Sequence, residues 1–238
     1  MTTEHLILSK IDSWKMFDAI AGRYDVLNHL LSLGLDRSWR KSMARLLPTQ
    51  SALQVLDVAT GTADVLIAML KANPRISLAY GIDMSEEMLK RGRAKIQKAG
   101  VEYRAVLSHG DAQAMAFPDQ TFTAVTIAFG IRNMPDLRKA LMEMYRVLRP
   151  SGRVIILEFS IPRNVVLRWG HLLYLRWVVP GVGFLVSGNF RAYKYLNHTV
   201  ETFPYGNHFM KILKQMGFVQ VAAHPLLGGV ATIYVGEK

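Results

Sequence analysis

An acidic residue and a turn of small residues, placed after two successive apolar strands, are the groups in this chain best suited to ligand chemistry. The apolar stretch Val55–Val58 runs into a turn that contains Gly61, and an apolar helical segment follows at once. A strand, a tight glycine turn and a helix start place backbone N–H groups beside a ligand at the carboxyl edge of a parallel sheet. Asp83 ends the next apolar strand, 22 residues after Gly61, and its carboxylate can accept both hydroxyls of a ribose. The spacing therefore predicts a nucleoside site.

The turn does not match the pattern of a dinucleotide site, which needs G-x-G-x-x-G. Ala59 and Ala63 flank Gly61, and Leu66 stands where the third glycine belongs. Asp57 also puts negative charge where phosphates would lie, and that charge suits the ammonium and sulfonium groups of S-adenosylmethionine. The alternative is a structural turn in which acidic side chains cap backbone groups.

The amino-acid composition limits the classes of protein to which this chain can belong. The chain has 238 residues, half of them apolar, which is enough for one large domain and excludes disorder. The absence of cysteine excludes disulfides, thiolate metal sites and cysteine nucleophiles. The net charge of +11 suits nucleic acid or an anionic membrane surface, but the basic residues are scattered and no basic-aromatic cluster favours nucleic acid. The first residues lack the features of a signal peptide, so we expect a cytoplasmic protein.

Apolar runs and turn signals predict an α/β chain. The further strands are expected at 102–107, 122–128, 154–157, 219–223 and 230–235. Ser85 resembles the N-cap of a helix that runs to about Ala99, and Met134-Pro135 is expected to open another helix. Alternation of strands with helices indicates a doubly wound sheet.

We expect a single domain in four parts. A helical N-terminal lid covers 1–49, a cofactor-binding core 50–160, an insertion between the fifth and sixth strands 161–202, and a C-terminal helix with strands 203–238. The lid and the insertion are expected to fold over the carboxyl edge of the sheet and to form the acceptor pocket.

Four further segments carry a more specific pattern. They are Tyr24-Asp-Val-Leu-Asn28 continuing to Trp39, Phe129-Gly-Ile-Arg-Asn133, Arg146–Gly152 continuing to Glu158-Phe-Ser160, and Tyr193-Lys-Tyr-Leu196 continuing to Pro204. Together they resemble the menaquinone/ubiquinone biosynthesis C-methyltransferase family along nearly the whole chain. The resemblance implies a Rossmann-like seven-stranded fold with an antiparallel last strand. It also implies methyl transfer from S-adenosylmethionine to a ring carbon of a prenylated quinol, with demethylmenaquinol to menaquinol as the expected reaction.

The resemblance also implies a set of cofactor contacts. The expected cofactor-binding residues are Thr62, Asp83, Asp111, Ala112, Gly61 and Asp57. A carboxylate at Asp111 can accept from the exocyclic amine of adenine, whereas Thr62 can equally be a turn hydroxyl bonded to backbone. Ala63 replaces the glycine usual in this turn, where a left-handed alanine costs roughly 1 kcal/mol. We therefore expect a small adjustment of the turn and retained binding.

Methyl transfer requires a nucleophilic ring carbon, which an ionised quinol hydroxyl provides. Arg132 follows the fourth strand and is expected to stabilise that ionised oxygen electrostatically or through water, with Asn133 beside it. Tyr24 and Asn28 are expected to orient ring oxygens from the lid. A salt bridge or carbonyl cap is the alternative for Arg132, and helix packing is the alternative for Tyr24. No metal is expected, since the seven histidines show no pairing at ligand spacing.

The segment 165–186 is strongly apolar but contains Arg168 and Arg176, so it is not expected to span a bilayer. On a helix, Trp169 and Trp177 suit a headgroup interface, which predicts peripheral contact with the inner face of the membrane. A core helix of the pocket or a dimer contact is the alternative. A homodimer or a quinone-synthesis complex is also compatible with the sequence.

Other functions remain open at this point. They are C-methylation of a benzoquinol in the ubiquinone pathway, methylation of another lipid, and cofactor binding by a scaffold without catalysis. The residues do not separate a naphthoquinol from a benzoquinol acceptor.

Overall fold

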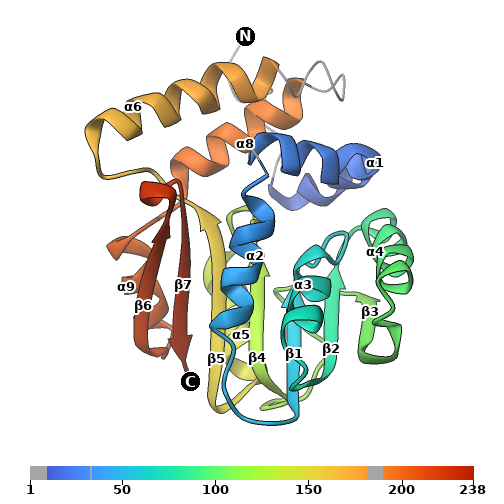
Figure 1. Cartoon of the computed structure of the whole chain (residues 1–238). Coiled ribbons are helices and arrows are strands. Elements are labelled where there is room, and N and C mark those ends of the chain that lie inside the picture. The colour runs from blue at the N-terminus through green and yellow to red at the C-terminus, as the bar shows by residue number, and fades with distance from the viewer. Residues whose placement is uncertain (1–9, 33, 182–189) are drawn as a thin grey trace.

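The computed structural model of this chain contains one sheet of seven strands. The strands are β1 (Leu53–Val58), β2 (Ile76–Asp83), β3 (Ala105–His109), β4 (Phe122–Ala128), β5 (Leu148–Phe159), β6 (Val219–Leu226) and β7 (Ala231–Glu237). They run in the order β3-β2-β1-β4-β5-β7-β6, and only β7 is antiparallel to its neighbours (Figure 1). This arrangement confirms the predicted Rossmann-like fold. The structure describes residues 10–32, 34–181 and 190–238, and the side chains of some helix residues, Tyr24 among them, lie outside the described part.

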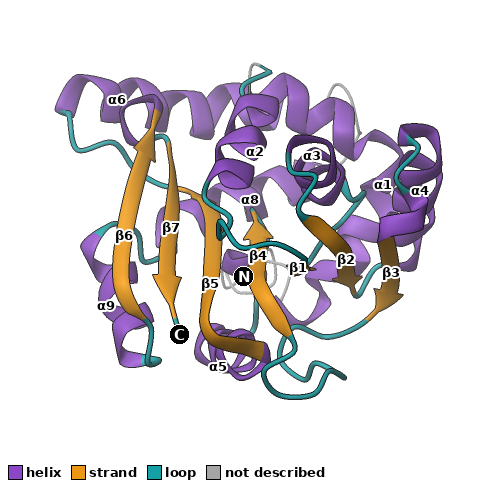
Figure 2. Ribbon diagram, turned by 60° about the horizontal axis from the view of Figure 1, so that its bottom comes forward, coloured by secondary structure: helices purple, strands orange, loops and turns teal. Residues whose placement is uncertain are grey.

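Helices cover both faces and one end of the sheet. They are α1 (Ser13–Leu31), α2 (Asp36–Arg45), α3 (Asp64–Ala72), α4 (Glu86–Ala99), α5 (Leu137–Val147), α6 (Val165–Leu173), α8 (Phe190–Thr202) and α9 (Asn207–Gln215). Helices α2, α3 and α4 pack on one face, and α5 and α9 on the other (Figure 2). Helices α1, α6 and α8 lie across the carboxyl ends of the parallel strands (Figure 1). These three helices therefore cover the edge of the sheet at which the sequence predicts the site.

The central strands explain the double covering. Every residue of β4 is buried except Ala128 at its end, and β5 is buried from Val154 to Glu158. A strand without an exposed face needs a helix layer on each side. The strand order reverses between β1 and β4, and a crevice for ligands forms at such a switch point.

Some predicted boundaries agree with the structure, and others need correction. The helix expected to open at Met134-Pro135 begins only at Leu137, because Asp136 is its N-cap, and the strand expected to end at 223 continues to Leu226. Strand β4 has the predicted bounds, and the Ser85 hydroxyl caps α4 by accepting from the Met88 N–H at 3.1 Å. The strand predicted from 102 begins only at Ala105, because 102–104 form a 3₁₀ turn, where the Arg104 guanidinium donates to two carbonyls. Strand β5 begins before the predicted 154, since Leu148 already pairs with Phe122.

The expected adjustment of the turn at Ala63 does not occur. Ala63 has φ 63° and ψ 21°, so the alanine keeps the left-handed conformation that a glycine would adopt. Its methyl group is fully buried, and a Cβ added to Gly92 on α4 would come within 3.3 Å of it. The turn therefore keeps its shape because α4 packs closely against it.

Candidate active site

Two cavities lie at the carboxyl edge of the sheet, one of about 210 Å³ and one of about 450 Å³. Phe17 of α1, together with Phe129 and Asn133 after β4, lines both cavities. The two spaces are therefore neighbours that share one wall.

The smaller cavity gathers four residues that the sequence places in the cofactor site. These are Gly61, Asp83, Asp111 and Ala112. Its other walls include the small residues Ala59, Gly110, Ala128 and Gly130, which leave room for a ligand close to the backbone.

Asp83 is held rigidly at the end of β2. Its Oδ2 accepts from the Gly61 N–H at 2.8 Å, and its Oδ1 accepts from the Ser85 N–H at 2.9 Å. Burial raises the pKa of Asp83, and these backbone N–H groups oppose the rise. Since each carboxylate oxygen can accept a second hydrogen bond, a pair of ribose hydroxyls can still bind here.

Asp111 lines the same cavity as Asp83. Its Oδ1 accepts from the Gln113 N–H at 2.8 Å and from Gln113 Nε2 at 3.4 Å. Within the described residues both contacts fall on Oδ1, so Oδ2 remains available to an exocyclic amine.

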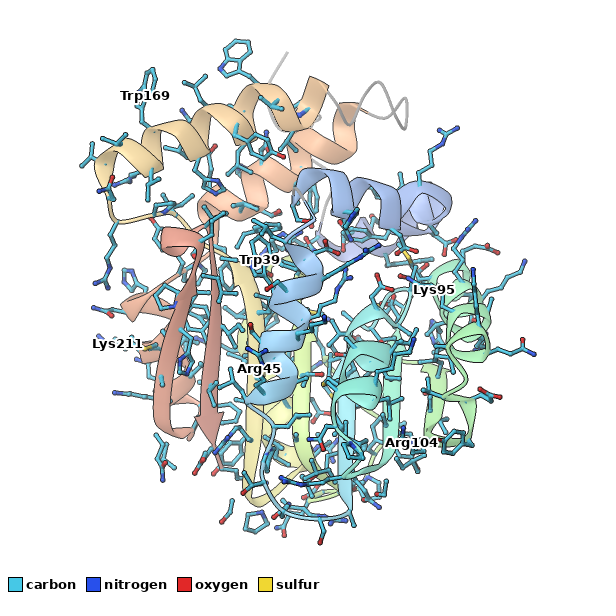
Figure 3. The ribbon with its side chains drawn as sticks, in the orientation of Figure 1. Trp39, Arg45, Lys95, Arg104, Trp169 and Lys211 are labelled. Carbon is cyan, nitrogen blue, oxygen red and sulfur yellow. The ribbon has the colours of Figure 1, made fainter. Side chains whose placement is uncertain are left out.

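The structure places Thr62 and Asp57 outside the cavity walls. The Thr62 hydroxyl donates to Asp25 of α1 at 2.6 Å and accepts from Lys95 of α4 at 3.0 Å (Figure 3 labels Lys95). Asp57 lies beneath the turn, where the hydroxyls of Thr60 and Thr126 donate to its carboxyl at 2.7 and 2.6 Å. Both side chains therefore support the turn from outside the space that a cofactor would occupy.

Asp57 gives the fold a measurable pH dependence. Burial raises the pKa of Asp57 to about 6, above its ordinary value of 3.8. A carboxyl whose pKa is raised on folding lowers stability as pH rises from about 4 through about 6, with a full effect of roughly 3 kcal/mol. Urea denaturation should therefore show a loss of about 1 kcal/mol between pH 5 and 7.5 that the Asp57→Asn variant lacks. Identical pH profiles for the two proteins would contradict this assignment.

Helix α1 is tied to the edge of the smaller cavity. Asp18 accepts from the Ser85 hydroxyl at 2.5 Å and from the Glu87 N–H at 3.2 Å. The carboxylate thus adds a second cap to α4, directly beside the backbone that holds Asp83.

The larger cavity is mainly apolar and lies between α1, α2, the end of β5 and α6. Trp39, Phe129 and Phe159 form one wall, with the Phe129 and Phe159 ring centroids 4.5 Å apart (Figure 3 labels Trp39). Of the predicted catalytic residues, Asn28, Arg132 and Asn133 line this cavity. Tyr24 lies on α1, and its side chain is outside the described part.

Arg132 is not a free cation. Its Nη1 donates to Glu158 Oε1 at 2.7 Å and to the Phe129 carbonyl at 2.6 Å, and the two side chains are 4% and 0% exposed. Burial raises the pKa of Glu158, and the charge of Arg132 opposes the rise. The two alternative roles considered for Arg132, a salt bridge and a carbonyl cap, are therefore both present in the structure. Arg132 Nε is buried without a hydrogen-bond partner among the described residues, which leaves one donor for a ligand.

Asn133 stands where the two cavities meet. Its Nδ2 donates to the Phe129 carbonyl at 3.5 Å, whereas its Oδ1 is buried and has no partner in the described part of the chain. An acceptor without a donor in a buried site is the group that a ligand hydroxyl would satisfy.

Sequence reasoning missed several polar residues of the larger cavity. Tyr195 of α8 is 3% exposed and lines this cavity. Asp36 of α2 accepts from Ser32, from the His29 ring and from Arg40. Glu158 does not line the cavity itself but is the buried partner of Arg132, which does. An acid inside an apolar strand indicates a buried partner, but nothing local in the sequence showed that the partner was Arg132.

Comparisons with known proteins show the family of this chain. The model of the ubiE/COQ5 methyltransferase family matches residues 8–238. The chain is 42% identical to the ubiquinone/menaquinone biosynthesis C-methyltransferase UbiE of Geotalea daltonii, over 94% of this chain and 95% of that protein. It is 43% identical to the demethylmenaquinone methyltransferase of Thermus thermophilus, over 94% of this chain and 100% of that protein.

Solved structures share the fold at low sequence identity. A SAM-dependent methyltransferase of Thermotoga maritima, a possible histamine N-methyltransferase, superposes with a TM-score of 0.66 at 17% identity, covering 94% of this chain and 99% of that one. A putative S-adenosyl-L-methionine-dependent methyltransferase of Methanococcus maripaludis gives 0.62 at 18% identity, covering 97% and 93%. With the family match over nearly all its length, the chain belongs to the ubiE/COQ5 methyltransferase family.

Proposed function

We propose that this chain transfers a methyl group from S-adenosylmethionine to a ring carbon of a prenylated quinol, converting demethylmenaquinol to menaquinol. The observation that carries the proposal is the shared wall. A cavity with carboxylates placed for a nucleoside and a more apolar cavity suited to a prenylated ring meet at Phe129 and Asn133. The named activities of the relatives from Geotalea daltonii and Thermus thermophilus support the same assignment.

The residues of the smaller cavity fit the cofactor. Asp83 would hold the ribose hydroxyls, Asp111 the adenine amine, and the Gly61 turn would let the cofactor approach the backbone. The cofactor supplies an electrophilic methyl group on a sulfonium. Among the described walls Lys10 is the one basic side chain, so the donor set suits a nucleoside better than a pyrophosphate. No metal enters the proposal.

The larger cavity would activate and orient the acceptor. Asn133 Oδ1 would accept from a quinol hydroxyl, and Arg132 Nε–H would donate to the oxygen as it becomes negative. Because Glu158 balances the charge of Arg132, the stabilisation comes from a fixed donor in a dry site, where such a donor has a large effect. Asn28, and Tyr24 from the same helix, would orient the ring from the lid. In this scheme the lid (1–49) and the insertion (161–202) hold the acceptor over the core (50–160).

A product assay tests this function directly. Purified protein with S-adenosylmethionine and demethylmenaquinol should yield a product heavier by one CH₂ unit. Parallel reactions with a ubiquinone-pathway benzoquinol and with a membrane phospholipid separate the alternative acceptors. Cofactor binding by calorimetry without turnover on any acceptor would support a scaffold instead.

The exposed face of helix α6 supports the proposal that the protein lies peripherally at the inner, cytoplasmic face of the membrane. Its solvent-facing apolar side chains are Val165 (77% exposed), Val166 (80%) and Trp169 (72%), and Trp177 (74%) continues the row in the π-helical turn η5 (Tyr174–Val178). Figure 3 shows Trp169 projecting away from the body of the protein. An exposed tryptophan row of this kind suits the headgroup layer, although a homodimer or a quinone-synthesis partner would cover the same row. None of the described helices has the length and apolarity needed to cross a bilayer.

A vesicle assay tests this position. The double variant Trp169→Ala, Trp177→Ala should bind anionic vesicles about tenfold or more weakly, because each ring contributes buried apolar area. Arg176 is a poorer test site, since it is already paired with Glu201 at 2.8 Å. Tyr103→Ala is the matched control, because Tyr103 is 73% exposed on another part of the surface. If wild type and double variant sediment equally with vesicles, the exposed row does not bind lipid and is better explained as a protein interface.

A further inference from the structure

Helix α6 and the π turn that continues it have two functional sides. His171, Leu175 and Val179 follow one another at four-residue spacing and line the larger cavity. Trp169, Leu173 and Trp177 follow at the same spacing and are exposed to solvent. One helix thickness therefore separates the apolar outer surface from the cavity.

The larger cavity reaches the surface beside this helix. Among its described lining residues, the exposed ones are Val166, Leu167 and Gly170 of α6 and Leu227 of the turn η6 (Leu227–Gly229). The other described lining residues are buried or partly buried. The opening therefore lies between α6 and η6, which joins β6 to β7 at the same end of the sheet (Figure 1).

The two sides of this opening approach each other closely at Gly228. A Cβ added to Gly228 would lie 2.8 Å from Leu167 Cδ1, and Gly228 has φ +65°. Leu167 is 51% exposed and Leu227 is 58% exposed. The rim thus consists of apolar side chains and glycine, and it continues into the exposed row of α6.

We propose that the rim formed by Val166, Leu167, Gly170 and Leu227 is the portal through which the prenyl tail of the acceptor leaves the cavity. A volume of about 450 Å³ is that of a site for one small-molecule ligand, so it accommodates the ring with a short part of a long tail. The rest of the tail needs an apolar path, because burial of apolar surface is what favours its position. The portal opens beside the row proposed to meet lipid, so the distal tail stays in the bilayer while the ring is methylated.

This inference rests on the proposed function and predicts an effect that depends on tail length. Leu167→Asp and Leu227→Asp place a charge on the portal. Each should lower kcat/KM for a long-tailed demethylmenaquinol by about tenfold or more, because the tail must then pass a charged group. The same variants should lose clearly less kcat/KM with a tail-free demethyl naphthoquinol, because that acceptor has no tail to pass the charged rim. Both acceptors are assayed in the same detergent micelles, and a tail-dependent loss caused by docking on the micelle would also appear in a variant of the exposed row outside the cavity wall.

Val165→Asp is the matched control. Val165 lies on the same helix and is 77% exposed, but it is not part of the cavity wall. It should leave both acceptors unaffected, and calorimetry with S-adenosylmethionine checks that each variant is folded. If kcat/KM falls equally with both acceptors, the rim belongs to the site that binds the ring, and the portal proposal is overturned. Unchanged rates with both acceptors would also overturn it, whereas a wild type inactive on both would refute the proposed function instead.

Discussion

Replacing Arg132 by alanine is expected to lower kcat and kcat/KM together by about 10²–10³-fold, the effect of removing one donor to a developing oxyanion. The donor in question is Nε–H, the one nitrogen of Arg132 that is buried without a partner among the described residues. Affinity for S-adenosylmethionine should stay near normal, because Arg132 lines only the larger cavity. Steady-state rates with a demethylmenaquinol acceptor, combined with cofactor calorimetry, measure both quantities.

The same substitution should also destabilise the protein. It leaves Glu158, which is 0% exposed, without its partner at 2.7 Å, and breaking a buried pair in this way costs about 3–5 kcal/mol. The double variant Arg132→Met, Glu158→Gln removes both charges and should recover most of the stability without recovering activity. Arg132→Lys should restore activity only in part, since an ammonium cannot reproduce the planar fork of donors. A variant with normal kcat and a raised acceptor KM would show that Arg132 only positions the ring.

Replacing Asp83 by alanine is expected to weaken binding of S-adenosylmethionine by about 2–4 kcal/mol, since two charge-assisted hydrogen bonds to ribose are lost. The structure adds a second cause, because the Gly61 and Ser85 N–H groups lose their acceptor at the same time. Asp83→Asn keeps one oxygen acceptor and should bind with intermediate affinity. Asp119→Ala serves as control, since Asp119 is 70% exposed and lines neither cavity. If calorimetry finds the same affinity for S-adenosylmethionine in Asp83→Ala as in wild type, the Asp83 carboxylate does not contact the cofactor.

The cofactor edge could be predicted from the sequence because its geometry is local. Gly61 and Asp83 end adjacent parallel strands, and pairing of β1 with β2 is sufficient to bring them together. The bounds of β4 follow from a short run of apolar residues and threonines between turns. Asp111 and Ala112, which follow β3, were implied by the family resemblance, and both line the smaller cavity.

The directions of side chains could not be predicted in this way. Thr62 follows Gly61 in a turn held by the left-handed Ala63, and its hydroxyl points to Asp25 and Lys95 on helices distant in sequence. The partner of Arg132 lies 26 residues away on β5. Such contacts depend on how whole elements pack, which no local pattern encodes.

Phe17, Phe129 and Asn133 bound both cavities, and this common wall makes the two binding equilibria interdependent. When a ligand in one cavity orders these side chains, they are already ordered for a ligand in the other cavity. The conformational entropy lost on ordering them therefore counts only once for the two binding steps. Linkage then requires that the acceptor raise cofactor affinity by the same factor as the cofactor raises acceptor affinity. Phe17 lies on α1, which Asp18 anchors to α4, so one helix contributes to the walls of both sites and any coupling between them would pass through it.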